Sequence, residues 1–430
     1  MGMRILVLGS GGREHALVRS LAASPLVDSV LAAPGNGGTA LDPKTVNVPM
    51  NIEDAAAVAT FACDDEVDLV VIGPEAPLVA GVADALREAG VLTFGPGASG
   101  ARVEGSKAFS KGLMDRHALP TGRARTFAAL DREAALATVR EWGAPIVIKA
   151  DGLAAGKGVT VAMDVDTALT AVEECFDGRF GDAGASVLVE EYLSGPECSM
   201  LAFVSGRTML PMAPSQDHKR VGEGDTGPNT GGMGVYSPVP LVTAAEHARM
   251  VEIMQGAADA LADEGIDYRG VLYGGFVLTD EGPKLLEFNA RFGDPETQVV
   301  LPRLKTDLTE VLLACAKGEL EGVTLEWSDD VAVSVVIASG GYPDFYPTGR
   351  AITGIEAAER EEGVMVYHAG TRLDDDGVLV TSGGRVLNVT AVARDFETAI
   401  ERAYRAVGRI AFEGAFSRRD IGQRALRARG

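Results

Sequence analysis

The sequence predicts a multidomain protein of the α/β and α+β classes. A chain of 430 residues exceeds one ordinary hydrophobic core, so two to four domains are expected. Over the first hundred residues apolar strands alternate with amphipathic helices, which is typical of a doubly wound parallel sheet. From about residue 330 onward, antiparallel-type strands precede a helix. We expect an N-terminal α/β domain at 1–102, a central module at 103–325 and a small C-terminal α+β domain at 326–430.

The N-terminal domain follows from its hydrophobic periodicity. Apolar runs predict strands at 3–9, 29–34, 67–74 and 91–96, and the segments between them predict helices at 13–24, 52–62 and 77–90. Ligands of such sheets bind at the carboxyl ends of the strands. The loops that gather there read "GSGGREH", "PGNGG" and "GPEAP".

The first of these loops resembles a dinucleotide fingerprint but departs from it. The third glycine of G-x-G-x-x-G is replaced by Glu14, and the second strand ends without an acid for a cofactor ribose. This argues against a nucleotide-binding dehydrogenase. We expect a single phosphate on the backbone N–H groups of Gly11 and Gly12 at the helix N-terminus, with a ligand-free tight turn as the alternative.

The central module contains a glycine-rich hairpin, "IVIKADGLAAGKGVTVAM". Gly152 and Gly156 are one residue too close for a Walker A loop, and Gly158 replaces its Ser/Thr. The apolar alternation that follows predicts a strand where a P-loop would need a helix. Further on, residues 222–238 are rich in Gly, Asn, Asp and Pro and predict a functional loop.

One strand of the central module carries metal-binding chemistry. In "KLLEFNARF", Leu286 and Phe288 alternate with Glu287, Asn289 and Arg291, so these three polar side chains share one face. Glu and Asn oxygens suit magnesium, and the guanidinium could neutralise a transferring phosphoryl group. A solvated strand face is the alternative.

The C-terminal domain is predicted from three strand patterns and one helix. The strand patterns cover 331–343, 364–373 and 383–393, and the helix covers 395–410.

Composition narrows the class of protein. Hydrophobic residues make up 46% of the chain and charged residues 23%, as in a globular enzyme. No apolar run reaches the roughly 18 residues needed to cross a bilayer, and the chain opens directly into a strand without a signal-peptide pattern. The four cysteines lie far apart and suit a reducing compartment. We expect a cytoplasmic protein without membrane contact.

The charge balance is strongly acidic. A net charge of −22 argues against a nucleic-acid surface. Only nine of the 39 basic residues are lysines. This bias predicts a halophilic host, with an acidic mesophile of G+C-rich genome as the alternative. Phosphorylated substrates would need a small basic pocket within this surface, which makes the few lysines informative.

The order of these elements resembles the ATP-grasp superfamily. Lys107 comes first, then Lys149 on the strand before the glycine loop, then the acidic bend "VEEYLSGPE", and finally the strand with Glu287 and Asn289. The resemblance implies a central ATP-grasp module whose lid subdomain, at about 123–190, closes its glycine loop over ATP.

Longer motifs resemble one family in particular, the phosphoribosylamine–glycine ligases. They include "LGSGGREHAL", "VIGPEAPLVAGV", "FGPGASGARVEGSKAF", "SQDHKRVGEGDTGPNTGGMGVYSP" and "LEFNARFGDPETQ". The resemblance implies that ATP, glycine and 5-phosphoribosylamine give N1-(5-phosphoribosyl)glycinamide, ADP and phosphate through glycyl phosphate. It also implies Mg²⁺ or Mn²⁺ as cofactor and a monomer or weak homo-oligomer. The alternative is another ATP-grasp ligase or carboxylase of the purine pathway. Segment 215–237 argues against this alternative, because it resembles the glycine ligases specifically.

The resemblance also implies roles for individual residues. The implied ATP-binding residues are Lys107, Lys149, Gly152, Gly156 and Gly158 at the phosphates, Glu190, Glu191 and Leu193 at the adenine, and Glu197 at the ribose. The implied metal ligands are Glu287 and Asn289, and the residues implied to face phosphoribosylamine are Gly11, Gly12, Glu75 and Asp294. The implied catalytic residues, facing glycine and the acyl phosphate, are Asp217, Lys219 and Arg291. We expect His218, beside Asp217, to be a structural hydrogen bonder, with a general base as the alternative.

Overall fold

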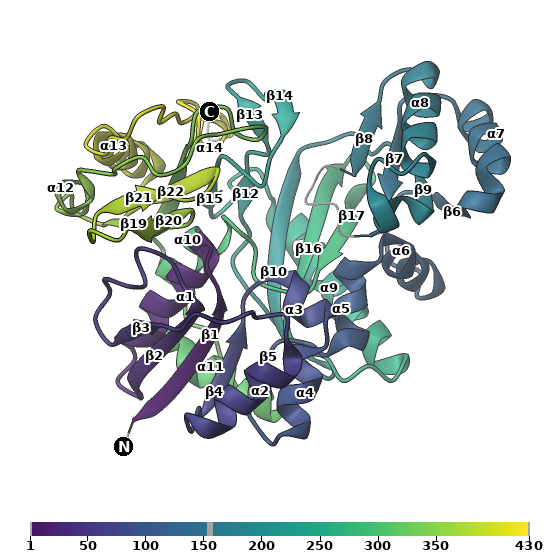
Figure 1. Cartoon of the computed structure of the whole chain (residues 1–430). Helices are drawn as coiled ribbons and strands as arrows, with labels where there is room; N and C mark the ends of the chain where they lie inside the picture. The colour runs from purple at the N-terminus through teal and green to yellow at the C-terminus, as the bar shows by residue number, and fades with distance from the viewer. Residues whose placement is uncertain (1, 153–157, 429–430) are drawn as a thin grey trace.

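The computed structural model describes residues 2–152 and 158–428. The N-terminal domain, the lid subdomain and the C-terminal domain lie around a central antiparallel sheet (Figure 1). The fold class predicted from the sequence is confirmed. The domain boundaries at 102 and 325 stay predictions.

The N-terminal domain is a parallel five-stranded sheet in the order β3-β2-β1-β4-β5. Its central strand β1 is apolar on both faces, since Ile5, Leu6, Val7 and Leu8 are all fully buried. The elements are β1 Met3–Gly9, α1 Gly12–Ala23, β2 Val27–Pro34, β3 Thr45–Asn47, α2 Ala55–Asp64, β4 Leu69–Ile72, α3 Glu75–Val79, α4 Val82–Glu88 and β5 Thr93–Phe94.

Two predictions for this domain were wrong in detail. The helix predicted at 77–90 is divided into α3 and α4, because Gly81 adopts a left-handed conformation with φ of 81°. The strand predicted at 91–96 forms only two residues of ladder, Thr93 and Phe94. The short strand β3 has no strong apolar pattern and was not predicted.

The central sheet is antiparallel in the order β11-β10-β16-β17. Helix α9 packs against β17, β11 and β16, and α11 packs against β16 and β10. The elements are α5 Ala98–Gly105, α6 Lys107–Arg116, β10 Glu197–Ser205, β11 Thr208–Pro211, α9 Ala244–Asp263, β16 Arg269–Thr279, β17 Gly282–Asn289, α10 Thr297–Val300, η3 Leu301–Arg303 and α11 Leu308–Lys317.

The lid subdomain has its own four-stranded sheet, β6-β9-β7-β8, covered by α7 and α8 (Figure 1). A separate apolar cluster from these elements forms its core. Strands β7 and β8 pair antiparallel, which confirms the predicted strand–loop–strand hairpin. Its elements are β6 Ala124–Ala128, η1 Ala129–Asp131, α7 Arg132–Trp142, β7 Ile146–Ala150, β8 Val159–Ala162, α8 Val165–Phe176, η2 Gly181–Ala185 and β9 Ser186–Glu191.

The C-terminal sheet has the order β12-β15-β18-β22-β19. Two of its strands, β12 and β15, come from the central segment of the chain. The loop predicted at 222–238 contains regular structure, namely the hairpin β13–β14 and strand β15. Backbone pairing needs no apolar alternation, so the sequence pattern did not reveal it. The elements are β12 Gln216–Asp217, β13 Arg220–Gly222, β14 Thr226–Asn229, β15 Gly234–Ser237, β18 Val331–Ala338, α12 Ile355–Glu359, β19 Val364–His368, β20 Thr371–Leu373, β21 Leu379–Thr381, β22 Arg385–Ala393, α13 Phe396–Val407 and α14 Gln423–Arg427.

An aromatic cluster joins the N-terminal domain to the central sheet. Phe94 of β5, Phe203 of β10 and Phe292 lie with ring centroids 5.9–6.2 Å apart. Each ring is at most 2% exposed. This cluster fixes the chain immediately after β17, where Arg291 lies. Within the described part of the chain, no helix has the length and apolarity to cross a membrane.

Candidate active site

Strand β17 carries the predicted polar face. Glu287 and Asn289 of β17, with Arg291 just beyond, are half-buried, while the alternate residues Phe288 and Phe292 are at most 2% exposed. The predicted alternation fails at Leu286. The ladder to β16 shifts register between Gly275 and Phe276, and this bulge leaves Leu285 buried and Leu286 half-buried.

The Glu287–Asn289 face fits a divalent cation. Gly275 pairs with Glu287 in the ladder, and a Cβ at Gly275 would lie 3.3 Å from the Glu287 Cγ. One carboxylate and one amide oxygen are hard ligands of the kind magnesium takes. No group of three or more His, Cys, Asp or Glu that could hold a metal occurs among the described residues. A metal here would therefore take most of its ligands from phosphates and water.

Lys107 begins helix α6 and points toward the lid hairpin. Its Nζ donates to the Gly152 carbonyl at 3.0 Å, and the Ser106 hydroxyl caps the helix by accepting from the Phe109 N–H. Asp151 fixes the same turn, since its carboxylate accepts from the Ala108 N–H at 2.8 Å. Burial lowers the pKa of Lys107, and Lys149 nearby adds to the effect, while Glu287 opposes it.

Lys149 extends from β7 toward β17. Its Nζ lies 2.5 Å from the Glu190 Oε2 and donates to the Leu286 carbonyl at 3.4 Å. The bulge at Leu286 therefore lies beside the lysine of the lid. Helix α6, the lid sheet and β17 meet at this point (Figure 1).

The lid hairpin is described only at its two ends. Gly152 lies so close to η2 that an added Cβ would come within 2.9 Å of the Ala183 Cα. At the other end the Gly158 carbonyl accepts from the Ala150 N–H at 2.8 Å. Gly156 lies outside the described residues, so its predicted role stays a prediction.

Glu190 is buried between two lysines. It is 2% exposed, and its second carboxylate oxygen contacts the Nζ of Lys111. Sequence reasoning missed Lys111. Its position four residues after Lys107, one helical turn along the same face, was the available signal.

The acidic bend after β9 leads into the central sheet. Glu191 is exposed and accepts from the Arg123 N–H at 3.1 Å, whereas Leu193 is 8% exposed. Glu197 begins β10. Desolvation of the Glu197 carboxylate raises its pKa. The negative charges of Asp217 and Glu287 add to this effect, and Lys219 opposes it.

Asp217 and Lys219 form an ion pair of 3.0 Å on the segment that includes β12. Burial alone would lower the pKa of Lys219, but Asp217, Tyr273 and Glu296 together raise it well above its usual value. Glu296 is 3% exposed and accepts from the Tyr273 hydroxyl at 3.1 Å. Burial, reinforced by Asp217, raises the pKa of Glu296. Sequence reasoning did not single out Glu296, although it lies in the polar run "GDPE".

His218 is buried beside Asp217 and lies against a backbone carbonyl, a geometry that fits its predicted structural role. It is 1% exposed, and its Nδ1 lies 3.3 Å from the Gly234 carbonyl. Burial lowers its pKa to about 4, with Arg418 and Arg424 adding to the effect.

Arg291 lies between two carboxylates from other segments. Its guanidinium is 2.7 Å from the Glu104 Oε1 and 3.3 Å from the Glu75 Oε2. Although burial opposes ionisation of Glu75, Arg291 and Arg13 hold the pKa of Glu75 below its usual value. Burial raises the pKa of Glu104 despite Arg291. Glu104 was not predicted, because nothing in α5 marks it as a partner of β17.

The first glycine loop holds a carboxylate of its own. The Gly11 N–H donates to the Glu14 Oε2 at 2.6 Å, so a phosphate on this amide would have to displace a buried side chain. A Cβ on Gly12 would lie 2.6 Å from the Gln298 Nε2. Asp294 accepts from the same Gln298 nitrogen at 2.8 Å and from the Arg13 N–H at 3.4 Å. The loop and Asp294 are therefore adjacent.

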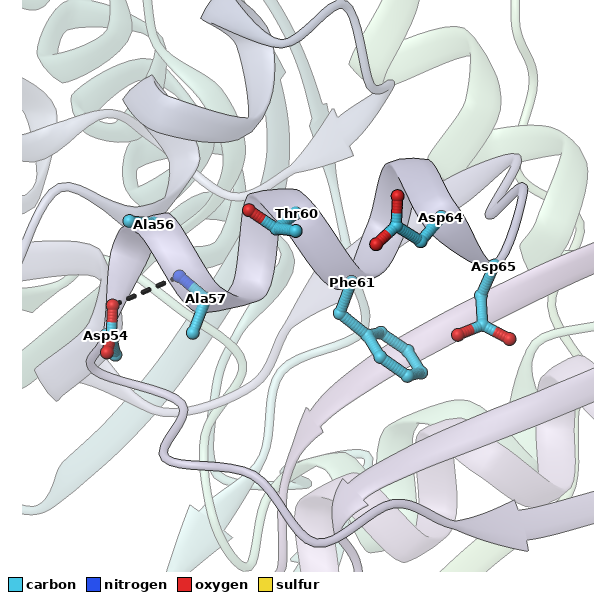
Figure 2. Close-up of a pocket in the computed structure, with 7 residues that line it drawn as sticks. All are labelled: Asp54, Ala56, Ala57, Thr60, Phe61, Asp64 and Asp65. Carbon is cyan, nitrogen blue, oxygen red and sulfur yellow. Dashed lines mark hydrogen bonds between the residues drawn. The ribbon is translucent and has the colours of Figure 1, made fainter.

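A surface cavity of about 530 Å³ lies on helix α2, and none of the site residues discussed above lines it (Figure 2). Its lining includes Asp54 at one end of the helix, and Phe61, Asp64 and Asp65 toward the other end. Three carboxylates would repel a polyphosphate. We do not place the active site there.

The fold and the site define a protein of the ATP-grasp class, in which Lys107 and Lys149 lie between the described ends of a glycine hairpin and the strand that carries Glu287 and Asn289. The sequence matches three profiles of phosphoribosylglycinamide synthetase: the N domain over residues 3–104, the ATP-grasp (A) domain over 105–297 and the C domain over 332–424. The chain belongs to this family, as the sequence motifs predicted.

Individual relatives agree with the profiles. The chain is 52% identical over 427 residues to a phosphoribosylamine–glycine ligase of Salmonella typhi, covering 99% of both chains. The crystal structure of the phosphoribosylamine–glycine ligase of Thermotoga maritima superposes with a TM-score of 0.85 at 32% identity, covering 97% of this chain and all of that one. The biotin carboxylase domain of a Hydrogenobacter thermophilus 2-oxoglutarate carboxylase shares the fold, with a TM-score of 0.75 at 17% identity, covering 97% of this chain and 92% of that one.

Proposed function

We propose that this protein ligates glycine to 5-phosphoribosylamine at the expense of ATP, giving N1-(5-phosphoribosyl)glycinamide, ADP and phosphate. The observation that carries the proposal is the convergence of Lys107, Lys149 and the β17 face at one junction between lid and central sheet. Family membership over nearly the whole chain supports the same reaction.

The reaction takes place in two steps. A glycine carboxylate oxygen attacks the γ-phosphorus of ATP, and the bond to the β,γ-bridging oxygen breaks to release ADP. The amine of phosphoribosylamine then attacks the carbonyl of glycyl phosphate, phosphate leaves, and the amine loses a proton. No side-chain nucleophile is needed, so the protein contributes by positioning and charge neutralisation.

The residues fit these demands in three groups. Lys107 and Lys149, with the 152–158 hairpin, bind the ATP phosphates, and the bend at Glu190, Glu191, Leu193 and Glu197 holds the nucleoside. Asp217, Lys219 and Arg291 face glycine and the acyl phosphate. Gly11, Gly12, Glu75 and Asp294 face phosphoribosylamine, and the Gly12 N–H is the amide donor we propose there, since Glu14 accepts from Gly11 and Asp294 from Arg13.

Glu287 and Asn289 would hold the divalent metal, which we propose to be Mg²⁺, with Mn²⁺ as a substitute. When bound, such a metal neutralises and orients phosphate oxygens of the nucleotide. The half-buried Glu287 also lies near Lys107, so the strand and helix α6 present opposite charges to the polyphosphate.

The test is ADP release in a mixture of ATP, magnesium, glycine and phosphoribosylamine generated in place. We expect rapid ADP formation only when both glycine and the amine are present, because a closed lid protects the acyl phosphate until the amine arrives. Equal turnover with bicarbonate in place of glycine would instead assign the site to a carboxylase.

A further inference from the structure

Lys111 is a buried lysine that the proposed reaction does not use. It lies one turn after Lys107 on α6, and its side chain is 6% exposed. Its Nζ contacts the Glu190 Oε1 and donates to the Thr121 hydroxyl at 2.6 Å. A lysine is rarely buried to this degree without a specific partner.

Glu190 is shared by two ammonium groups. Lys111 contacts one carboxylate oxygen, and the Nζ of Lys149 lies 2.5 Å from the other. The side chains of Glu190 and Lys149 are 2% and 8% exposed. Lys111, Glu190 and Lys149 therefore form a buried cluster where α6, β7 and β9 meet.

This arrangement matters when a nucleotide binds. Besides Glu190, Lys149 contacts the Leu286 carbonyl at a long 3.4 Å, so Glu190 is its main partner. If Lys149 turns toward a phosphate, one oxygen of Glu190 loses its cation. A buried carboxylate left without a cation is strongly disfavoured. Lys111 would remain on the other oxygen.

We propose that Lys111 is a positioning residue for ATP, which keeps the Glu190 carboxylate paired and so frees Lys149 to bind the nucleotide phosphates. The inference rests on the proposed function in one respect, namely that Lys149 is an ATP ligand. A purely structural role is the competing explanation. Lys111 also reaches β17 through Thr121, whose hydroxyl donates to the Leu285 carbonyl at 2.7 Å.

The substitution Lys111→Met removes the charge and keeps the length of the side chain. Lys149 should then be held on Glu190, so the Kd for magnesium adenylyl imidodiphosphate should rise roughly tenfold or more. In a Glu190→Gln background no carboxylate holds Lys149. There Lys111→Met should change the Kd by less than about threefold relative to Glu190→Gln alone. Isothermal titration calorimetry without glycine or phosphoribosylamine measures the Kd of each variant.

Thr121→Val is the matched control, because it removes the second partner of Lys111 and leaves both charges in place. We expect a Kd within about twofold of wild type. Circular dichroism checks that each variant is folded. Should Lys111→Met not fold, Lys111→Gln takes its place in the same comparison.

Three results would overturn the proposal: a wild-type Kd in Lys111→Met, an equal loss in the Glu190→Gln background, or a loss in Thr121→Val as large as in Lys111→Met. The Kd of the nucleotide is measured without glycine or phosphoribosylamine, so it does not depend on the ligation reaction. A protein that shows the expected pattern but does not ligate glycine would therefore contradict the proposed function alone, and a protein that binds no nucleotide would contradict both.

Discussion

Glu287 and Asn289 share the half-buried face of β17, and the charge of Glu287 acts on both Lys107 and Lys219. We propose that Glu287 supplies the anionic ligand of the divalent metal. Glu287→Gln keeps the shape and removes one negative charge. We expect kcat to fall roughly 10²-fold, equivalent to about 3 kcal/mol of transition-state stabilisation, in a coupled ADP assay at saturating ATP.

Glu281→Gln provides the control for this prediction. Glu281 lies at the turn of the same β16–β17 hairpin, is largely exposed and pairs with Lys284 three residues on. Its loss should leave kcat and the magnesium dependence unchanged. A Glu287→Gln enzyme with wild-type activity at limiting magnesium would show that the Glu-x-Asn face is only a solvated strand.

His218 makes a second prediction, which concerns stability against pH. Its folded pKa is about 4, whereas an exposed histidine titrates near 6.5. The unfolded chain therefore binds this proton first, and stability falls as pH drops from about 6.5 to about 4, by up to about 1.4 kcal/mol per pH unit. Above about 6.5 this group adds no pH dependence.

The substitution His218→Gln should make the melting temperature less sensitive to acid between pH 7 and pH 5. His247→Gln, on the surface helix α9, is the matched control and should retain the wild-type slope. Scanning calorimetry at the two pH values compares them. An unchanged slope in His218→Gln would mean that the buried histidine is not the group that titrates.

At this scale the sequence predicted residues that share a strand and missed their partners. Glu287 and Asn289 could be placed on one face because strand periodicity is local, whereas β17 ends before Arg291, which was predicted on the same strand. Glu104 and Lys111 could not be predicted from local patterns. Each meets its partner across 79 or more residues of sequence, through contacts that only the tertiary fold creates.

Among the elements, the hairpin β13–β14 is held by the C-terminal segment rather than by a core of its own. Arg418 has a side chain 2% exposed, contacts Asp225 at 3.0 Å and Asp420 at 2.7 Å, and donates to the Arg220 carbonyl. This hairpin directly follows Asp217 and Lys219. We call the contacts of Arg418 with Asp225 and Asp420 the clamp. The clamp links the end of the chain to the proposed glycine site.

Arg418→Met should destabilise the protein, since it leaves two carboxylates facing each other without their buried cation. We expect a loss of about 2–3 kcal/mol and a melting temperature several degrees lower. Arg424→Met is the matched control. Arg424 also contacts Asp225, but its side chain is 39% exposed, so its loss should cost less than about 1 kcal/mol. Equal losses in both variants would contradict the clamp.

Elements with strong apolar periodicity were predicted best. The strands of the parallel sheet and the lid hairpin followed from continuous or alternating apolar runs, and both are present. The segment at 222–238 was predicted as a loop, because its strands are short and its β15 pairs with β18, about a hundred residues later. Pairing at that distance leaves no local signal.

For the whole molecule, the acidic surface predicts tolerance of salt. The net charge of −22 destabilises the compact state through repulsion, which salt screens to about 3 Å at 1 M. Activity and melting temperature should hold or rise as KCl increases from roughly 0.1 M to above 1 M. A loss of fold or activity over that range would contradict the halophilic interpretation and leave the proposed reaction unaffected.

The central claim is that glycine is activated as an acyl phosphate on this site, and oxygen transfer tests it directly. Glycine labelled with ¹⁸O in both carboxylate oxygens should pass one label to inorganic phosphate in each turnover, and the other should remain in the amide product. Mass spectrometry of the phosphate and of N1-(5-phosphoribosyl)glycinamide measures both. Phosphate that carries no label while the product forms would contradict the account, because the glycine carboxylate would then never have attacked ATP.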